Sequence, residues 1–205
     1  MSTQIDIRIL ELLSARLCHE LISPVGAINN GVELLGEEDP EFVRDAVTLV
    51  GQSAKKAAQR LQFYRFAYGT LGGGSAGLDP RDLLAGLLEG GKVTGSWTPA
   101  ALALPSEWKK LACNMAVLAV EALPRGGEVT IDALPGGPGL VVTARGEALN
   151  VTPEAGAAIA RTAPVEELTS RTVQGYFTAH LATRLGVALG AAAAAGSWVL
   201  TAGKP

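Results

Sequence analysis

The sequence is poor in aromatic residues and in blocks of positive charge. Aromatic residues make up 5% of the 205 residues and apolar residues 48%, so a core must be built mainly from Leu, Val, Ile and Ala. The formal net charge is -3, and no run of Lys and Arg occurs. This balance argues against nucleic acid or an anionic membrane as the main partner.

Long apolar runs and clustered cysteines are also absent. No run reaches the ~18 residues that a membrane-spanning helix needs. Charged residues interrupt the N-terminal stretch MSTQIDIRILE, so we expect no secretion signal and a cytoplasmic protein. The two cysteines, Cys18 and Cys113, lack metal-ligand spacing, and each lies in an apolar helical pattern. This pattern predicts buried reduced thiols and no metal site.

The first part of the chain has the pattern of a helical hairpin. Residues 5–36 carry apolar side chains at steps of three and four, from Leu10 to Leu35, which predicts an amphipathic helix. Asp39 and Pro40 then begin a second helix that runs to about residue 68. Alone, such a hairpin covers only one side of each apolar stripe. Two hairpins from two subunits would close a four-helix bundle, and we therefore predict a homodimer.

The glycine-rich stretch after the hairpin predicts a linker at residues 71–78, which divides a hairpin domain at 1–70 from a second domain at 79–205. The second domain combines helices with mostly antiparallel strands, which is typical of an α+β sandwich. The predicted helices span residues 79–88, 106–123, 153–160 and 172–185, and the predicted strands span 92–97, 128–134, 140–144, 187–189 and 197–201.

His19 is the residue of greatest chemical interest in the first helix. It lies two residues from Leu17 and two from Leu21, so at ~100° per residue it points away from the apolar stripe. We therefore expect an exposed imidazole on a face that a large convex partner can approach. The neighbours expected on that face are mostly small: Ala15, Arg16, Ser23, Gly26 and Ala27.

Two residues beside His19 have predicted roles. Glu20 can hydrogen-bond one imidazole nitrogen, which fixes the tautomer and leaves the other nitrogen as a nucleophile. Pro24 removes a backbone N–H and adds ring bulk, so it should bend or interrupt the helix just beyond. We predict that Pro24 and the small residues of this face form a partner-binding surface.

The string HELISP at residues 19–24 resembles the H-box of sensor histidine kinases, although Ser23 stands where those proteins usually have Asn or Thr. The longer stretch LCHELISPVGAINNGVELL at residues 17–35 closely resembles the ChpT family of alphaproteobacterial histidine phosphotransferases. The resemblance extends over nearly the whole chain. It implies a dimeric hairpin followed by a degenerate histidine-kinase ATPase-like α/β sandwich, with His19 as the phosphorylated residue.

Within that second domain, the residues that would bind ATP are missing. NMAVLAVEALPRGGEVTI at residues 114–131 resembles the N-box helix and following strand of the kinase domain, but Leu118 replaces the asparagine that holds Mg²⁺. Ala144 replaces the aspartate that contacts adenine, and the expected glycine-rich lid contains only Gly175. We therefore expect no ATP binding and no cofactor.

The family resemblance implies a relay. His19 would take a phosphoryl group from the receiver domain of a hybrid histidine kinase and pass it to response regulators, while Mg²⁺ would be held by the receiver. An ATP-dependent sensor histidine kinase and a non-catalytic receiver-binding scaffold are the alternatives.

Several other residues have weaker signals. The neighbours of His180 favour a packing role. Phe63, Tyr64 and Phe66 are candidates for the docking surface, although some of them must belong to the core. Arg161 and Arg171 are candidate receiver contacts in the second domain, where a solvated charged surface is the competing interpretation.

Overall fold

The structure is a computed structural model that describes residues 6–70, 77–137 and 139–203. Of the predicted linker at 71–78, only Gly77 and Leu78 lie within the described residues. The division into two domains therefore stays a prediction. We refer to residues 77–203 as the C-terminal region.

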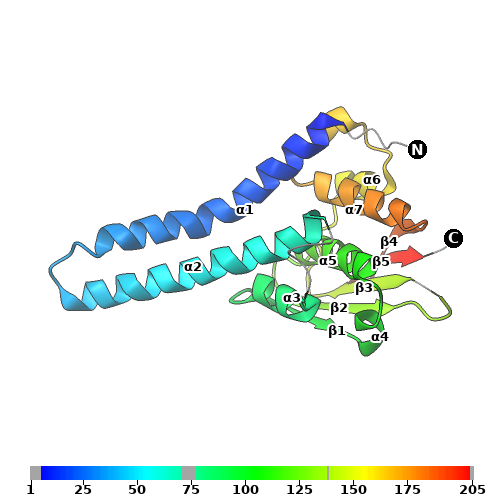
Figure 1. The fold of residues 1–205 in the computed structure, drawn as a ribbon. Coiled ribbons are helices and arrows are strands. Elements are labelled where there is room, and N and C mark those ends of the chain that lie inside the picture. The colour runs from blue at the N-terminus through cyan, green and yellow to red at the C-terminus, as the bar shows by residue number, and fades with distance from the viewer. Residues whose placement is uncertain (1–5, 71–76, 138, 204–205) are drawn as a thin grey trace.

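The N-terminal part is a hairpin of two long helices, α1 (Ile7–Leu34) and α2 (Pro40–Tyr68), as the sequence predicted. Figure 1 shows the two helices side by side, with their connecting turn far from the sheet. The side chains of Asp6 and Asp39 cap the two helices by accepting backbone N–H groups, and Pro40 occupies the first turn of α2. Close packing near the turn requires Gly31, because a Cβ there would lie 2.6 Å from Cγ2 of Val50.

Pro24 does not interrupt α1, which is one continuous helix through this residue. A proline cannot donate to the carbonyl four residues earlier, so the carbonyl of Glu20 loses its usual helical partner. The guanidinium of Arg60 on α2 donates a hydrogen bond to that carbonyl instead. The predicted interruption is therefore wrong: α1 continues through Pro24, and α2 supplies a donor to the carbonyl that Pro24 leaves free.

The C-terminal region contains a five-stranded sheet with the order β1-β2-β3-β5-β4, in which β1 pairs with β2 in parallel and the other pairs are antiparallel. The strands are β1 (Val93–Trp97), β2 (Gly127–Ala133), β3 (Leu140–Arg145), β4 (Ala188–Ala194) and β5 (Ser197–Gly203). The helices are α3 (Pro80–Leu88), α4 (Pro99–Leu102), α5 (Ser106–Glu121), α6 (Pro153–Ala160), the 3-10 turn η1 (Val165–Glu167) and α7 (Val173–Arg184).

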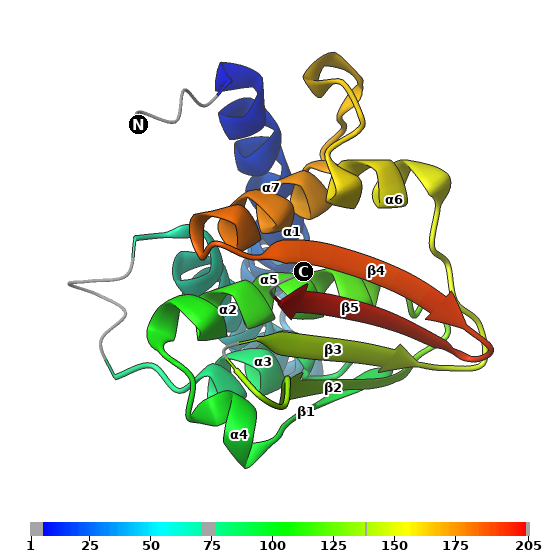
Figure 2. The same ribbon diagram turned by 90° about the vertical axis from the view of Figure 1, so that its right-hand side faces the viewer.

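One face of this sheet carries the core. Buried and partly covered residues alternate along β2, β3 and β5, with Val129, Val142 and Leu200 pointing into the protein. Helices α5 and α7 lie over that face in Figure 2, and every residue of α5 from Lys110 to Ala119 is buried. The predicted α+β class, a helical hairpin followed by a sandwich, is confirmed.

Strand β4 corrects one part of the prediction. The sequence predicts a short strand at 187–189 followed by a Gly/Ala turn, but the alanine run belongs to β4, which pairs with β5 as far as Ala194 and Ser197. β4 lies at the edge of the sheet and is almost entirely exposed. Alanine has a low strand propensity, so pairing with the more strongly patterned β5 decides this conformation.

The hairpin leaves many apolar side chains uncovered. Its exposed large apolar residues are Ile7, Leu10, Ile22, Val25, Val32, Leu34, Leu35, Phe42, Val47, Leu49 and Leu61. Within the described part of the chain, no helix is long and apolar enough to cross a membrane.

Candidate functional site

His19 lies near the middle of α1 with an exposed side chain, as its helical phase predicted. Ala15 and Ser23, each about one turn away, are also exposed, and Gly26 and Ala27 are half-buried. These four small residues leave space around the imidazole. The imidazole of His19 is therefore accessible from solvent.

Arg16 and Pro24 do not belong to this open surface, and their predicted exposure is wrong. Arg16 is 5% exposed, because its guanidinium donates to the carboxylate of Glu121 at the end of α5 and, at 3.2 Å, to the carbonyl of Ser170. Pro24 is buried in the hairpin. The predicted partner surface therefore retains only Ala15, Ser23, Gly26 and Ala27, and their contact with a partner stays a prediction.

Glu20 is held by α2. Its carboxylate lies 3.4 Å from Nη1 of Arg60, in an ion pair that is largely shielded from solvent. The same guanidinium also binds the Glu20 carbonyl that Pro24 leaves free. Among the hydrogen bonds of the described residues, none joins Glu20 to His19. The carboxylate thus lies next to His19 with a fixed position, and its control of the imidazole tautomer stays a prediction.

Sequence reasoning missed Arg60 and Glu121. The register of the hairpin could have indicated Arg60. Gly31 packs against Ala46 and Val50, and in an antiparallel pair this register brings the second half of α2, which contains Arg60, opposite Glu20. No local pattern points to Glu121, because it meets Arg16 only when the C-terminal region packs on α1.

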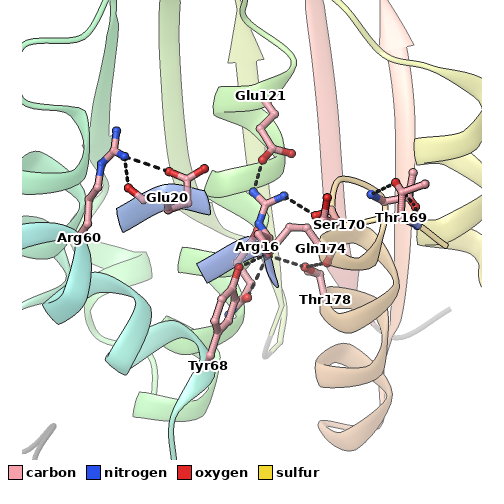
Figure 3. A network of polar contacts seen from close by, with 11 residues as sticks. Arg16, Glu20, Arg60, Tyr68, Glu121, Thr169, Ser170, Gln174 and Thr178 are labelled. Carbon is pink, nitrogen blue, oxygen red and sulfur yellow. Dashed lines mark hydrogen bonds and ion pairs between the residues drawn. The ribbon is translucent and has the colours of Figure 1, made fainter. Parts of the chain in front are cut away.

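The residues that resemble a kinase N-box are occupied by contacts within the chain. Nδ2 of Asn114 donates to the carbonyls of Ala67 at 2.8 Å and Lys110 at 2.9 Å, and its Oδ1 accepts from Gln174 at 3.0 Å. The hydroxyl of Tyr68 donates to Oε1 of Gln174 at 2.6 Å. This network, drawn in part in Figure 3, joins α2, α5 and α7.

Leu118 and Ala144 stand where the kinase motifs have Asn and Asp, and neither side chain offers a ligand to a nucleotide or cation. Leu118 and Ala144 are 5% and 0% exposed and pack in the core. In the described ranges, no group of three or more His, Cys, Asp and Glu side chains is arranged to hold a metal ion. These side chains do not fit Mg²⁺–ATP, whose cation requires oxygen ligands.

The weaker candidates fall mostly in the core. Phe63, Tyr64 and Phe66 are 0%, 3% and 3% exposed, so their assignment to a docking surface is wrong: they close the junction between α2 and the C-terminal region. His180 packs with its ring centroid 4.8 Å from that of Tyr176, and burial lowers its pKa, with Arg161 adding to the effect. Arg161 is exposed.

The two cysteines differ from each other. Cys113 is buried, as predicted, and its burial raises the pKa of the thiol. Cys18 is exposed, so the predicted burial of this thiol is wrong. It directly precedes His19 and lies on the part of α1 that neither α2 nor the C-terminal region covers.

Comparison with known proteins gives consistent matches. A family described as histidine phosphotransferase C-terminal domain matches residues 78–197. The protein phosphotransferase ChpT of Brucella abortus (strain 2308) is 36% identical over 196 residues, which is 93% of this chain and 93% of that protein. The 1.7 Å structure of a bacterial phosphotransferase is 34% identical, covers 98% of both chains and superposes with a TM-score of 0.79.

A histidine kinase is more distantly similar. The blue-light activated histidine kinase EL346 of Erythrobacter litoralis is 10% identical, with a TM-score of 0.45 over 90% of this chain and 58% of that one.

Proposed function

This chain belongs to the histidine phosphotransferase family, and we propose that His19 is the residue that carries the phosphoryl group. The protein is a phosphotransferase of a phosphorelay, and a relay of this kind requires an accessible nucleophile. His19 is exposed on α1 among small residues, whereas His180 is partly covered and stacked on Tyr176. The exposure of His19 is the observation that carries this proposal.

The chemistry follows from imidazole as a nucleophile. A neutral ring nitrogen of His19 attacks the phosphorus of a receiver's aspartyl phosphate in line; the N–P bond forms as the O–P bond breaks, and the aspartate carboxylate leaves. The reverse reaction passes the group to the aspartate of the next receiver. Positioning dominates the rate of such a transfer, and the ion pair between Glu20 and Arg60 keeps this part of α1 fixed against α2.

We assign the two partners from the resemblance to the ChpT family. The donor is the receiver domain of a hybrid histidine kinase, and the acceptors are response regulators in the cytoplasm. Each receiver would bind Mg²⁺ through its own acidic residues, so this chain supplies the nucleophile and the docking surface at Ala15, Ser23, Gly26 and Ala27. No ATP is needed, since the phosphoryl group arrives from a receiver.

We also propose that two copies form a four-helix bundle. The uncovered apolar residues of the hairpin, Val25, Val32 and Leu61 among them, mark a surface that requires a partner. A second hairpin has the matching length and pattern. Light scattering at tens of micromolar should give the mass of a dimer; a strict monomer under those conditions would contradict this arrangement.

A reconstituted transfer tests the central proposal. A phosphorylated receiver is mixed with the wild-type protein, with His19→Ala and with His180→Ala as the matched control. Label should reach the wild type and the control, and it should be labile to acid and stable to alkali, as a phosphoramidate is. Label on His19→Ala, or its absence from the wild type, would contradict the proposal.

A further inference from the structure

The first half of α1 is attached to the C-terminal region by two arginines. Arg8 donates from Nε to the carbonyl of Val165 at 3.1 Å, and from Nη2 to the carbonyls of Glu166 at 3.0 Å and Leu168 at 3.2 Å. Two turns further along, Arg16 donates to the carbonyl of Ser170 and to the carboxylate of Glu121. We call these contacts, between Arg8 and Arg16 of α1 and residues 165–170 and Glu121, the clasp.

Apolar contacts accompany the clasp. Ile9 of α1 is 6% exposed and belongs to a small core with Ala158, Leu168 and Val173. This core is separate from the main core under the sheet. The N-terminal part of α1 is therefore a packed interface with η1 and α7, and the arginines lie along its border.

The clasped segment is itself held in shape. The backbone N–H of Thr169 donates to Oγ1 of Thr172 at 2.9 Å, and that of Thr172 donates back to Oγ1 of Thr169 at 3.3 Å. These reciprocal bonds close the turn that presents the carbonyl of Ser170 to Arg16, as Figure 3 shows. A turn fixed in this way can hold a guanidinium in one position.

The clasp lies directly beside His19. Arg16 precedes His19 by three residues, which is one turn of helix and a rotation of about 60° around the axis. The groups that Arg16 holds therefore border any receiver that docks on His19. Arg16 keeps 6% of its side chain exposed and Glu121 keeps 41%, so the arginine is inside the junction and the glutamate stands at its solvent edge.

We propose that Arg16, through Glu121 and Ser170, is a positioning residue that fixes the C-terminal region beside His19, so that receivers meet one rigid composite surface. This inference rests on the function proposed above. An arginine suits the task because its planar fork binds the carboxylate and the carbonyl together, which a lysine ammonium cannot do with the same geometry. Misplacement of a docking surface by about 1 Å costs a transfer reaction up to about a hundredfold.

The test uses Glu121→Gln and Arg16→Lys in the full-length protein. Glu89→Gln is the matched control, because Glu89 pairs with Lys55 across the same two parts of the chain at 2.5 Å, but both side chains are at least half exposed. Three quantities are measured: amide hydrogen exchange in residues 165–172, the dependence of transfer rate on the concentration of a phosphorylated receiver, and phosphorylation of His19 by phosphoramidate, a small donor that needs no docking.

We expect both clasp variants to exchange faster in residues 165–172 and to need about ten times more receiver for half-maximal transfer. Their labelling by phosphoramidate should equal that of the wild type, and Glu89→Gln should match the wild type in every measurement. Glu121→Gln changes a side chain at the solvent edge, so it tests the clasp even where Arg16→Lys folds poorly.

Three results would overturn the inference: unchanged exchange in residues 165–172, unchanged transfer from the receiver despite faster exchange, or an equal loss of receiver and phosphoramidate labelling. A wild-type protein that accepts no phosphoryl group would instead refute the proposed function, so the two failures are distinguishable.

Discussion

The hairpin and the C-terminal region differ in how far their large apolar side chains are buried. In the described part of the chain, every exposed large apolar residue lies between Ile7 and Leu61. The C-terminal region instead buries Leu111, Ile131 and Leu200 completely. A single copy thus completes the core under the sheet but leaves apolar side chains of the hairpin exposed, and the proposed dimer would cover them.

The largest expected effect comes from opening the C-terminal core. Leu111 is 0% exposed on the central helix α5, so Leu111→Ala should lower the free energy of unfolding by about 2–5 kcal/mol through a cavity. Because this core is complete within one copy, the loss should be the same at all protein concentrations, as urea unfolding would show. A loss of stability that disappears at high protein concentration would contradict the claim that this core is complete within one copy.

A charge introduced on the hairpin should have an effect that depends on protein concentration. Val32 is 53% exposed on α1, and Val32→Glu would place a charge in the proposed bundle, weakening dimerisation more than about tenfold. Thermal stability would then depend strongly on concentration. The exposed Asn30, nearly opposite on the helix, gives Asn30→Glu as a control. Equal masses for both variants by light scattering would argue against a bundle on this face.

Removing Arg60 should have an intermediate effect. Arg60→Met leaves the Glu20 carbonyl and carboxylate without their donor, which should cost about 1–3 kcal/mol. Lys55→Met, at a site that is 61% exposed, should cost less than about 1 kcal/mol. Urea unfolding of the two variants side by side measures the difference, and equal losses would show that Pro24 needs no support from α2.

The smallest expected effect concerns the second histidine. Burial, with help from Arg161, lowers the pKa of His180 below its ordinary value. The unfolded chain then binds the proton more readily, so the free energy of unfolding should fall slightly as the pH drops through about 6.5. Proton NMR titration of the imidazole signals, assigned with His19→Ala, measures the pKa. Titration of His180 at or above its ordinary value would contradict its packing.

The sequence predicted the features that depend on local geometry. Helical phase alone placed His19 on an exposed face, and the cap residues Asp39 and Pro40 located the start of α2. The resemblance to the N-box found Asn114 on a helix, which is α5. Each of these inferences needs only neighbours within a few turns of the chain.

The sequence could not predict what distant segments cover. The sequence pattern places one apolar stripe on α1, but the C-terminal region also covers a second face of this helix. The burial of Arg16 and Ile9 on that face has no signal in the helix itself. The predicted burial of Cys18 is wrong for a related reason. A residue next to the apolar stripe can lie outside the contacts of α1 with α2 and with the C-terminal region. The hydrophobicity of Phe63 and Phe66 does not distinguish a core from a docking surface.

The clasp also constrains the order in which the protein can fold. During synthesis α1 emerges first, but the carbonyls that bind Arg8 and Arg16 belong to residues 165–170, which emerge more than a hundred residues later. Contacts this far apart in sequence form late and slow the folding of a chain. The helix that carries His19 therefore reaches its final surroundings only after most of the chain has left the ribosome.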